Sequence, residues 1–330
     1  MTGGRGPFGI GRGVSGHTLF RKRAAGRKPA AAGGRHGAFQ GKRRKSPAGQ
    51  KFFGGGFRGW YFKCQGPGGS LALIPAVHAG GGSLQLITEG ESRNVPFAAG
   101  QCAVSAARPR AALGQNLFCE RGLRLAVDAP GLAALGEVRF GPLSPPAWDV
   151  MGPFCAVPFL QCRHRVASMA HPLSGRLVVN GRDFDFDGGR GYIEGDRGRS
   201  FPSGYLWTQC LFEGGSLMLA AAQVPLGPAA FRGVIALVRL EGTEWRLASY
   251  LGARVTALGG GGVTVRQGEL CLFARRLGGP GHALRAPAAG VMERTVRENL
   301  SCPAAYRLTR GGRVLLDLTA ENASFEYEYP

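Results

Sequence analysis

Apolar and polar positions alternate along much of the chain, which is the pattern of half-buried β-strands. In LVVNGRDFDF (177–186), Phe184 and Phe186 are separated and preceded by aspartates, so one face is apolar and the other polar. The pair Asn180-Gly181 accepts the positive φ angles of a type I′ turn. The segment therefore predicts a β-hairpin.

Further hairpins are predicted in the second half of the chain. Residues 233–255 form two apolar runs around Glu241-Gly242-Thr243, and residues 305–318 form two around Gly311-Gly312. Only residues 292–300 (MERTVRENL) have a composition suited to a helix. With 56 Gly and 21 Pro in 330 residues, long helices are disfavoured, and an all-β sandwich or barrel is predicted.

A faint repeat divides this β sequence into two. WYFKC at 60–64 and LWTQC at 206–210 both end in Cys, and GGSL follows each of them, at 68–71 and 214–217. The offset is 146 residues in both cases. A constant offset predicts two similar β modules in tandem.

The expected domain organisation follows from this repeat and from the composition of the first residues. Residues 1–35 are rich in Gly, Ala and Arg with almost no core-forming side chains, and they are predicted to be a disordered basic tail. An RNA-binding tail, a misplaced start codon and an organellar transit peptide are the alternatives. A first β domain is predicted at 36–170 and a second at 171–330.

The net charge of +20 depends mostly on the start of the chain. Thirteen basic residues precede residue 52, and the first acidic residue is Glu89. Nucleic-acid binding is not favoured, because the basic segment lacks interleaved aromatic platforms. The eight cysteines form no Cys-x-x-Cys pair, and no apolar run of about 18 residues could cross a bilayer. We expect a cytoplasmic protein with reduced cysteines, for which peripheral membrane contact stays open.

The acidic segment DFDFDGGRGYIE (183–194) matches the spacing of an EF-hand calcium loop. Asp183, Asp185, Asp187 and Glu194 would supply the oxygen ligands. An EF-hand loop joins two helices, however, and this segment follows a predicted hairpin. The aspartates are interpreted as the solvated face of a strand, and no metal site is predicted.

Several motifs together resemble one family. They are GWYFKC (59–64), LALIPAVH (71–78), MGPFCAVPFLQCRHRVASMAHPLSG (151–175), GYIEGDRGRSFPSGYLWTQC (191–210) and ASYLGA (248–253). Their order and combination are similar to the tocopherol cyclase-like family, over residues of about 36–330. The resemblance implies two lipocalin-like (calycin-type) β-barrels. It also implies an intramolecular cyclase of the isomerase or lyase class that closes a chromanol ring on a prenylated hydroquinone, without a cofactor.

Five positions differ from the usual family pattern. They are Arg58 (usually acidic), Gln161 (usually Glu), Ala170 (usually Asn), Arg197 (usually aromatic) and Leu211 (usually Asn). The Glu194–Asp196–Gly198–Ser200 motif is intact.

The resemblance assigns catalytic roles to Asp196, Glu194, His164 and His171. Ring closure needs an acid that protonates an alkene in a dry pocket, and Asp196, expected on a glycine-rich loop at the pocket mouth, is the predicted acid. An ion pair with a neighbouring arginine is the structural alternative for it. Either histidine would orient the hydroquinone hydroxyl or accept its proton, or would be a buried core residue.

An apolar pocket is predicted around six further residues. They are Trp60, Tyr61, Tyr192, Tyr205, Trp207 and Gln209. Their rings would stabilise a cation, and the amide would bind a quinol oxygen; core packing is the alternative. The same pocket would also serve a second function class, a non-catalytic lipocalin-like carrier of an apolar isoprenoid or lipid.

Overall fold

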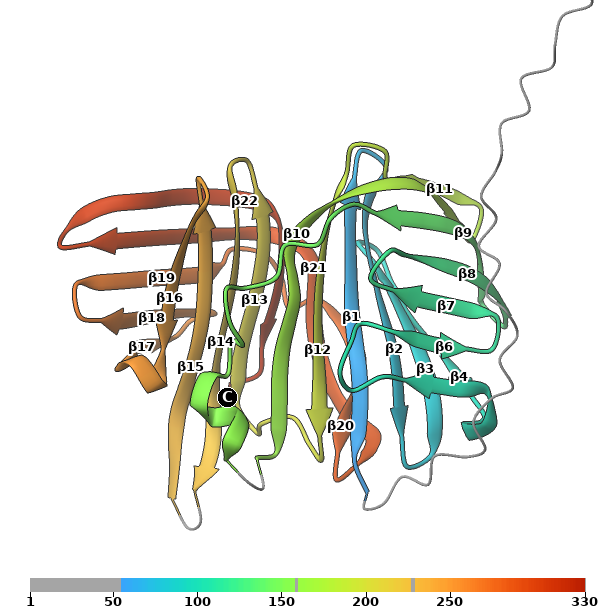
Figure 1. The fold of residues 1–330 in the computed structure, drawn as a ribbon, viewed down its shortest axis with the longest axis horizontal. Helices are drawn as coiled ribbons and strands as arrows, with labels where there is room; N and C mark the ends of the chain where they lie inside the picture. The colour runs from blue at the N-terminus through green and yellow to red at the C-terminus, as the bar shows by residue number, and fades with distance from the viewer. Residues whose placement is uncertain (1–54, 158–159, 227–228, 330) are drawn as a thin grey trace, which may run out of the picture. The chain divides into compact units, whose positions relative to one another are not determined.

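Antiparallel β-strands make up almost all of the regular structure (Figure 1). The computed structural model describes residues 55–157, 160–226 and 229–329. The helical elements there are short 3-10 turns, Ala99–Gln101 (η1), Gly152–Ala156 (η2) and Ser249–Leu251 (η3). None of the helices in these ranges has the length and apolar character needed to cross a membrane. The all-β prediction is confirmed, and the predicted tail at 1–35 lies outside the described residues.

The first sheet has twelve strands. They are β1 (Phe57–Gly66), β2 (Gly69–His78), β3 (Gly81–Thr88), β4 (Ser92–Phe97), β5 (Cys102–Val104), β6 (Ala111–Leu113), β7 (Asn116–Cys119), β8 (Gly122–Ala129), β9 (Leu132–Phe140), β10 (Cys162–Val179), β11 (Arg182–Asp185) and β12 (Arg190–Gly198). The strand order is β4-β3-β2-β1-β12-β10-β9-β8-β7-β6-β5, with β11 paired to β10.

The second sheet has ten strands. They are β13 (Tyr205–Phe212), β14 (Gly215–Leu226), β15 (Ala229–Leu240), β16 (Thr243–Ala248), β17 (Arg254–Gly259), β18 (Gly262–Gln267), β19 (Leu270–Arg276), β20 (His282–Ala288), β21 (Val291–Arg310) and β22 (Arg313–Tyr327). The order is β16-β15-β14-β13-β22-β21-β19-β18-β17, with β20 paired to β21.

The two sheets share one topology, and the sequence repeat marks equivalent strands in them. WYFKC lies in β1 and LWTQC in β13, and each GGSL lies at the start of the next strand. In both sheets the first strand pairs with the second on one side and with the last on the other. Within the described residues, no pairing of β4 with β5 or of β16 with β17 closes either sheet.

The change from one sheet to the other does not fall at the predicted boundary. Strand β10 runs through residues 170 and 171, and the chain leaves the first sheet after Gly198 and enters the second at Tyr205. The predicted domain boundary at 170/171 therefore lies inside a strand of the first sheet. Strand β10 continues past residue 171 because its first half pairs with β12 and its second half pairs with β9 and β11. The division into two domains stays a prediction.

The predicted hairpins are present. Asn180 and Gly181 have φ angles of 49° and 80° between β10 and β11, and Phe184 and Phe186 are buried. The turns at Glu241-Gly242 and Gly311-Gly312 likewise join β15 to β16 and β21 to β22. The segment of helical composition, 292–300, is a strand within β21, because pairing with β20 and β22 on either side outweighs its intrinsic preference.

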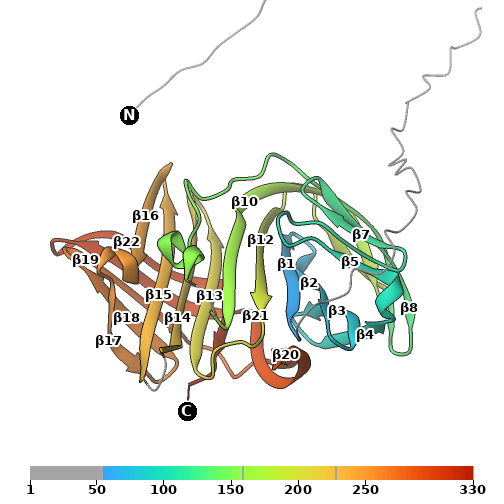
Figure 2. The same cartoon turned by 60° about the horizontal axis from the view of Figure 1, so that its bottom comes forward.

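Three groups of buried apolar side chains form the core. One lies within the first sheet and one within the second. The third draws residues from both sheets, including Tyr61, Tyr192, Trp207 and Leu300. Strand β10 contacts β14, and β2 contacts β21, which places this third group between the sheets (Figure 2). We call it the inter-sheet layer.

Candidate functional site

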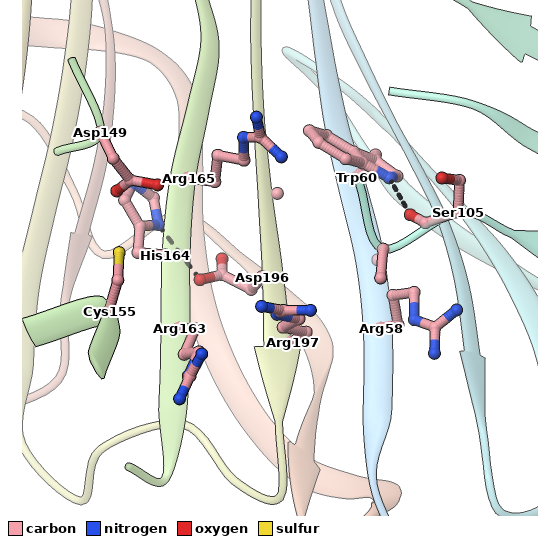
Figure 3. Close-up of a pocket in the computed structure, with 13 residues that line it drawn as sticks. Arg58, Trp60, Ser105, Asp149, Cys155, Arg163, His164, Arg165, Asp196 and Arg197 are labelled. Carbon is pink, nitrogen blue, oxygen red and sulfur yellow. Dashed lines mark hydrogen bonds and ion pairs between the residues drawn. The ribbon is translucent and has the colours of Figure 1, made fainter. Parts of the chain in front are cut away.

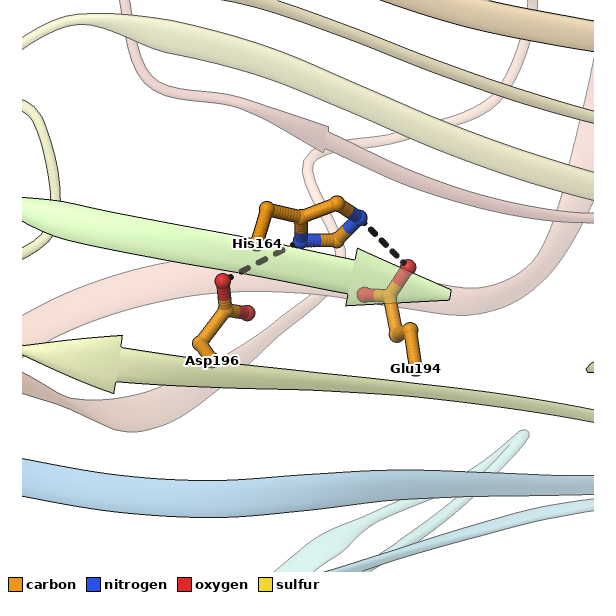
Figure 4. Close-up of side chains that lie close together, drawn as sticks. All are labelled: His164, Glu194 and Asp196. Carbon is orange, nitrogen blue, oxygen red and sulfur yellow. Dashed lines mark hydrogen bonds and ion pairs between the residues drawn. The ribbon is translucent and has the colours of Figure 1, made fainter. Parts of the chain in front are cut away.

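His164 lies between two carboxylates at the edge of the inter-sheet layer. Its Nδ1 is 3.1 Å from Oδ1 of Asp196, and its Nε2 is 3.3 Å from Oε2 of Glu194 (Figure 4). His164 of β10 is the direct cross-strand partner of Asp196 of β12. Glu194 is two residues from Asp196 on the same strand, so alternation aims both carboxylates to one face.

These three side chains are shielded from water to different degrees. The side chains of His164 and Asp196 are 13% and 22% exposed, whereas Glu194 is 7% exposed. Burial disfavours a charged imidazole, but the carboxylates of Glu194 and Asp196 outweigh it, so the pKa of His164 is raised well above its usual value. His164 therefore holds a proton at neutral pH and forms an imidazolium that a ligand can reach.

Glu194 is fixed by two donors from the inter-sheet layer. The Tyr192 hydroxyl donates to its Oε2 at 2.6 Å, and the Trp207 indole Nε1 donates to the same oxygen at 3.1 Å. Burial, followed by the charge of Glu194, raises the pKa of Tyr192 well above its usual value. Tyr192 therefore stays a neutral donor, and the carboxylate that faces His164 has one defined position.

A second buried carboxyl group, at Glu298 of β21, belongs to the same layer. The Tyr61 hydroxyl donates to its Oε1 at 2.6 Å, whereas its Oε2 has no hydrogen-bond partner among the described residues. Burial raises the pKa of Glu298 to about 7, and the charge of Glu194 adds to the shift. Sequence reasoning missed Glu298, because it lies in no recognisable motif and in a segment of helical composition.

Lys63 is the buried cation of this layer. Its side chain is almost fully buried, and its Nζ donates to the carbonyl oxygen of Asn322 at 3.2 Å. Burial lowers the pKa of Lys63 to about 8. Lys63 and Glu298 thus both titrate near neutral pH, on either side of the junction between the sheets.

Four of the six predicted pocket residues share the inter-sheet layer. They are Tyr61, Tyr192, Tyr205 and Trp207. The rings of Tyr61 and Trp207 meet edge to face with centroids 5.5 Å apart. Gln209 follows Trp207 on the same face of β13; it is fully buried, and neither amide atom has a hydrogen-bond partner in the described part of the chain.

Trp60 and His171 do not join this cluster. Trp60 belongs to the core of the first sheet, because adjacent residues of a strand face opposite ways and Tyr61 faces the second sheet. Gly195 allows this packing, since a Cβ there would lie 2.6 Å from the Trp60 ring. His171 packs on Phe140 at 4.7 Å and contacts Ser168, and burial lowers its pKa to about 4, so it is neutral.

A cavity of about 180 Å³ lies at the ends of β1, β10 and β12 (Figure 3). Its lining comprises Arg58, Gly59, Trp60, Ser105, Ala106, Asp149, Cys155, Arg163, His164, Arg165, Gly195, Asp196 and Arg197. Most of the side chains that line this cavity are charged, and the predicted apolar pocket stays a prediction. Asp196 lies within strand β12 and not on a loop, because the glycines around it pair with β1 and β10.

His164, Glu194 and Asp196 are also the described residues whose geometry could hold a metal ion, with ligand atoms within 4.8 Å of one another. Both imidazole nitrogens already face carboxylates, and four arginines line the adjoining cavity, so the charge around it disfavours a further cation. The residues of the EF-hand spacing do not gather: Asp183 is exposed, and Glu194 is buried against Tyr192.

No family model matches the chain, and no curated protein matches its sequence significantly. Several solved structures are similar to it, including the following three. Kievitone hydratase from Nectria haematococca is 11% identical, with 83% of this chain and 89% of that chain covered and a TM-score of 0.51. CghA, solved with Sch210972, is 9% identical, with 83% and 88% covered and a TM-score of 0.53. A putative AttH from Nitrosomonas europaea is 12% identical, with 84% and 93% covered and a TM-score of 0.47. The first two share the all-β fold of this chain.

Proposed function

We propose that the chain is a cyclase- or hydratase-type enzyme in which His164 protonates an alkene of a prenylated hydroquinone. The observation that carries the proposal is the placement of His164 between Glu194 and Asp196, with a carboxylate on each ring nitrogen. Two carboxylates hold the proton on the imidazole at neutral pH, and the partial exposure of the ring leaves it within reach of a ligand.

The proposed reaction is an isomerisation without redox chemistry. The His164 proton forms a new C–H bond at the less substituted alkene carbon, and the π bond breaks to leave a tertiary cation. The phenol oxygen attacks that cation, which closes the ring, and the phenolic proton passes to Asp196 and restores the imidazolium. If water captures the cation in place of the phenol, the product is hydrated. A site that excludes water therefore acts as a cyclase, and one that admits water acts as a hydratase.

The aromatic residues of the inter-sheet layer support this assignment. Tyr192 and Trp207 donate hydrogen bonds to the buried side of Glu194, and so hold the carboxylate that faces His164 in place. The motifs that resemble the tocopherol cyclase-like family include His164, Glu194 and Asp196, and the fold is shared with a hydratase, which also supports the class of reaction.

The proposal includes the closure of each sheet into a lipocalin-like barrel. In both sheets the last strand pairs with the first, and the two outermost strands follow each other in the sequence: β4 and β5 are linked by residues 98–101, and β16 and β17 by residues 249–253. An up-and-down strand order with adjacent edges is the order of a barrel.

The cavity beside His164 gives no support to a carrier of apolar ligands. Its volume of about 180 Å³ is below the roughly 300–1,000 Å³ of most small-molecule sites, and arginines line it. A site of this size accommodates the reacting ring of a prenyl quinol and not its whole chain.

The variant Asp196→Asn tests the assignment. The amide removes one of the two negative charges that hold the His164 proton, so we expect the alkaline limb of the pH–rate profile to move to lower pH. Turnover of a prenylated hydroquinone should fall by about 10²-fold or more, with ligand binding retained. Asp183→Asn, which replaces an exposed aspartate outside the site, is the matched control. An unchanged pH profile, or equal losses of binding and folding stability, would show that Asp196 is structural.

A further inference from the structure

Three arginines form a row across the three strands that carry the site. Arg163 of β10 pairs with Arg197 of β12, which in turn pairs with Arg58 of β1. Directly paired residues of antiparallel strands present their side chains on the same face. The row therefore lies on one face of the sheet, and His164 and Asp196, one position along, alternate to the other face, so the cavity at the strand ends is lined from both faces.

Arg165 and Trp60 extend this row on the same face. Each is two residues from a member of the row, and both line the same cavity. The Trp60 ring lies against Gly195, and its Nε1 donates to the carbonyl oxygen of Ser105 at 2.7 Å. The cavity thus combines four guanidinium groups with an aromatic ring that has a fixed position.

Backbone carbonyl groups hold these arginines in place. Arg58 donates to Val104 at 2.9 Å, Arg165 to Ala107 at 2.6 Å and Arg163 to Val157 at 3.3 Å. A guanidinium has five N–H donors, so one such bond anchors Arg163 or Arg165 and leaves others for a ligand. The carbonyl partners of Arg163 and Arg165 are neutral, so they orient these two guanidinium groups without cancelling their charge.

Positive charge accumulates at the cavity. No carboxylate of the described chain lies within 4.0 Å of a guanidinium nitrogen of Arg163, Arg165 or Arg197. The pKa of Arg58 is lowered by burial and by the charge of Arg197.

The two aspartates of the lining have other partners. The Asp149 carboxylate accepts the backbone N–H of Met151, and that of Asp196 accepts from His164 and Cys162. The positive charges lie together on one face, and the neighbouring carboxylates are bonded to other groups. This face therefore attracts an anion.

We propose that this arginine face binds the oxyanion of a small organic molecule, a carboxylate or a phosphate ester, beside the ring of Trp60. Planar guanidinium groups match both oxyanions with paired hydrogen bonds, and the indole supplies a flat apolar contact for the body of the ligand. The site goes beyond the proposed activity, because binding at this face needs no turnover.

Calorimetric titration of the full chain with benzoate, phenyl phosphate and inorganic phosphate tests the proposal. We expect saturable binding of at least one of them, weakened about tenfold or more by Arg197→Gln and by Arg163→Gln. Arg197→Lys, which keeps the charge but loses the planar fork, should weaken binding less. Arg313→Gln, at an exposed arginine of β22 outside the cavity, is the control and should leave binding unchanged.

The pattern of binding also distinguishes the two oxyanions. Benzoate alone would identify a carboxylate ligand, phenyl phosphate alone a phosphate ester, and inorganic phosphate as tight as phenyl phosphate a free phosphate ion. The proposal is overturned if none of the three binds at 10 mM (roughly the weakest affinity that such a site would show), or if the two Arg→Gln variants bind as the wild type does while remaining folded.

Discussion

In His164→Gln, turnover of a prenylated hydroquinone is expected to fall by roughly 10²–10⁴-fold, the range that a positioned general acid contributes. Glutamine can still donate a hydrogen bond to Asp196 or Glu194, but its amide cannot supply a proton. The rate of chromanol formation, measured by chromatography under saturating substrate, checks this expectation. Circular dichroism of the same preparation confirms that the sheets are intact.

The matched control is His282→Gln. His282 lies on β20, where its Nε2 contacts the carbonyl oxygen of Glu89, away from the cavity. Its replacement should leave turnover at the wild-type rate. Equal activity of His164→Gln and the wild type would remove His164 from the mechanism, and a loss shared by both variants would indicate a general effect of histidine replacement.

Glu298→Gln is expected to make the protein more stable at pH 8 and to change little at pH 4.5. The glutamine oxygen can still accept the hydrogen bond from Tyr61, and the amide removes a carboxyl group that burial disfavours when ionised. A pKa raised from 4.5 to about 7 corresponds to at most about 3 kcal/mol of unfolding free energy. Loss of attraction to the Lys63 ammonium reduces this gain.

The direction of the pH dependence follows from proton binding. Between pH 4.5 and about 7 the folded protein keeps a proton on Glu298 that the unfolded chain releases. The stability of the wild type therefore falls as pH rises through this window, and that part of the fall should vanish in Glu298→Gln. Urea unfolding at pH 4.5 and pH 8 measures both. Destabilisation of the variant at pH 8 with no change at pH 4.5 would show that the ionised carboxylate stabilises the fold, against this expectation.

Local patterns in the sequence predicted the strands, and the repeat predicted two β modules, but neither located the position at which the chain changes sheet. Asn180-Gly181 determines its hairpin through its own backbone preferences, so the turn could be found from a few residues. The change of sheet after Gly198 depends on the pairing of β12 with β1, which lies far back along the chain. The conformation of segment 292–300 could not be predicted from its own residues either, because pairing with the strands on both sides makes it a strand.

The candidate site was predictable where a motif carried it. His164, Glu194 and Asp196 were singled out from two motifs, and the structure brings them together. Trp60 and Tyr61 were assigned to one pocket although neighbours on a strand face opposite ways, and that alternation was available from the sequence. Glu298 and the arginine row depend on pairings between distant strands, which no local pattern reveals.

Turnover of a prenylated hydroquinone in D₂O, followed by mass spectrometry of the product, shows whether His164 delivers the proton to the alkene. His164 exchanges its nitrogen-bound hydrogen with solvent, so alkene protonation by this residue places one non-exchangeable deuterium on the carbon next to the new ether carbon. With the wild-type chain we expect a chromanol or hydrated product that carries one such deuterium, and with His164→Gln we expect little product. Absence of any product with the wild type, or a cyclised product without carbon-bound deuterium, would contradict this mechanism.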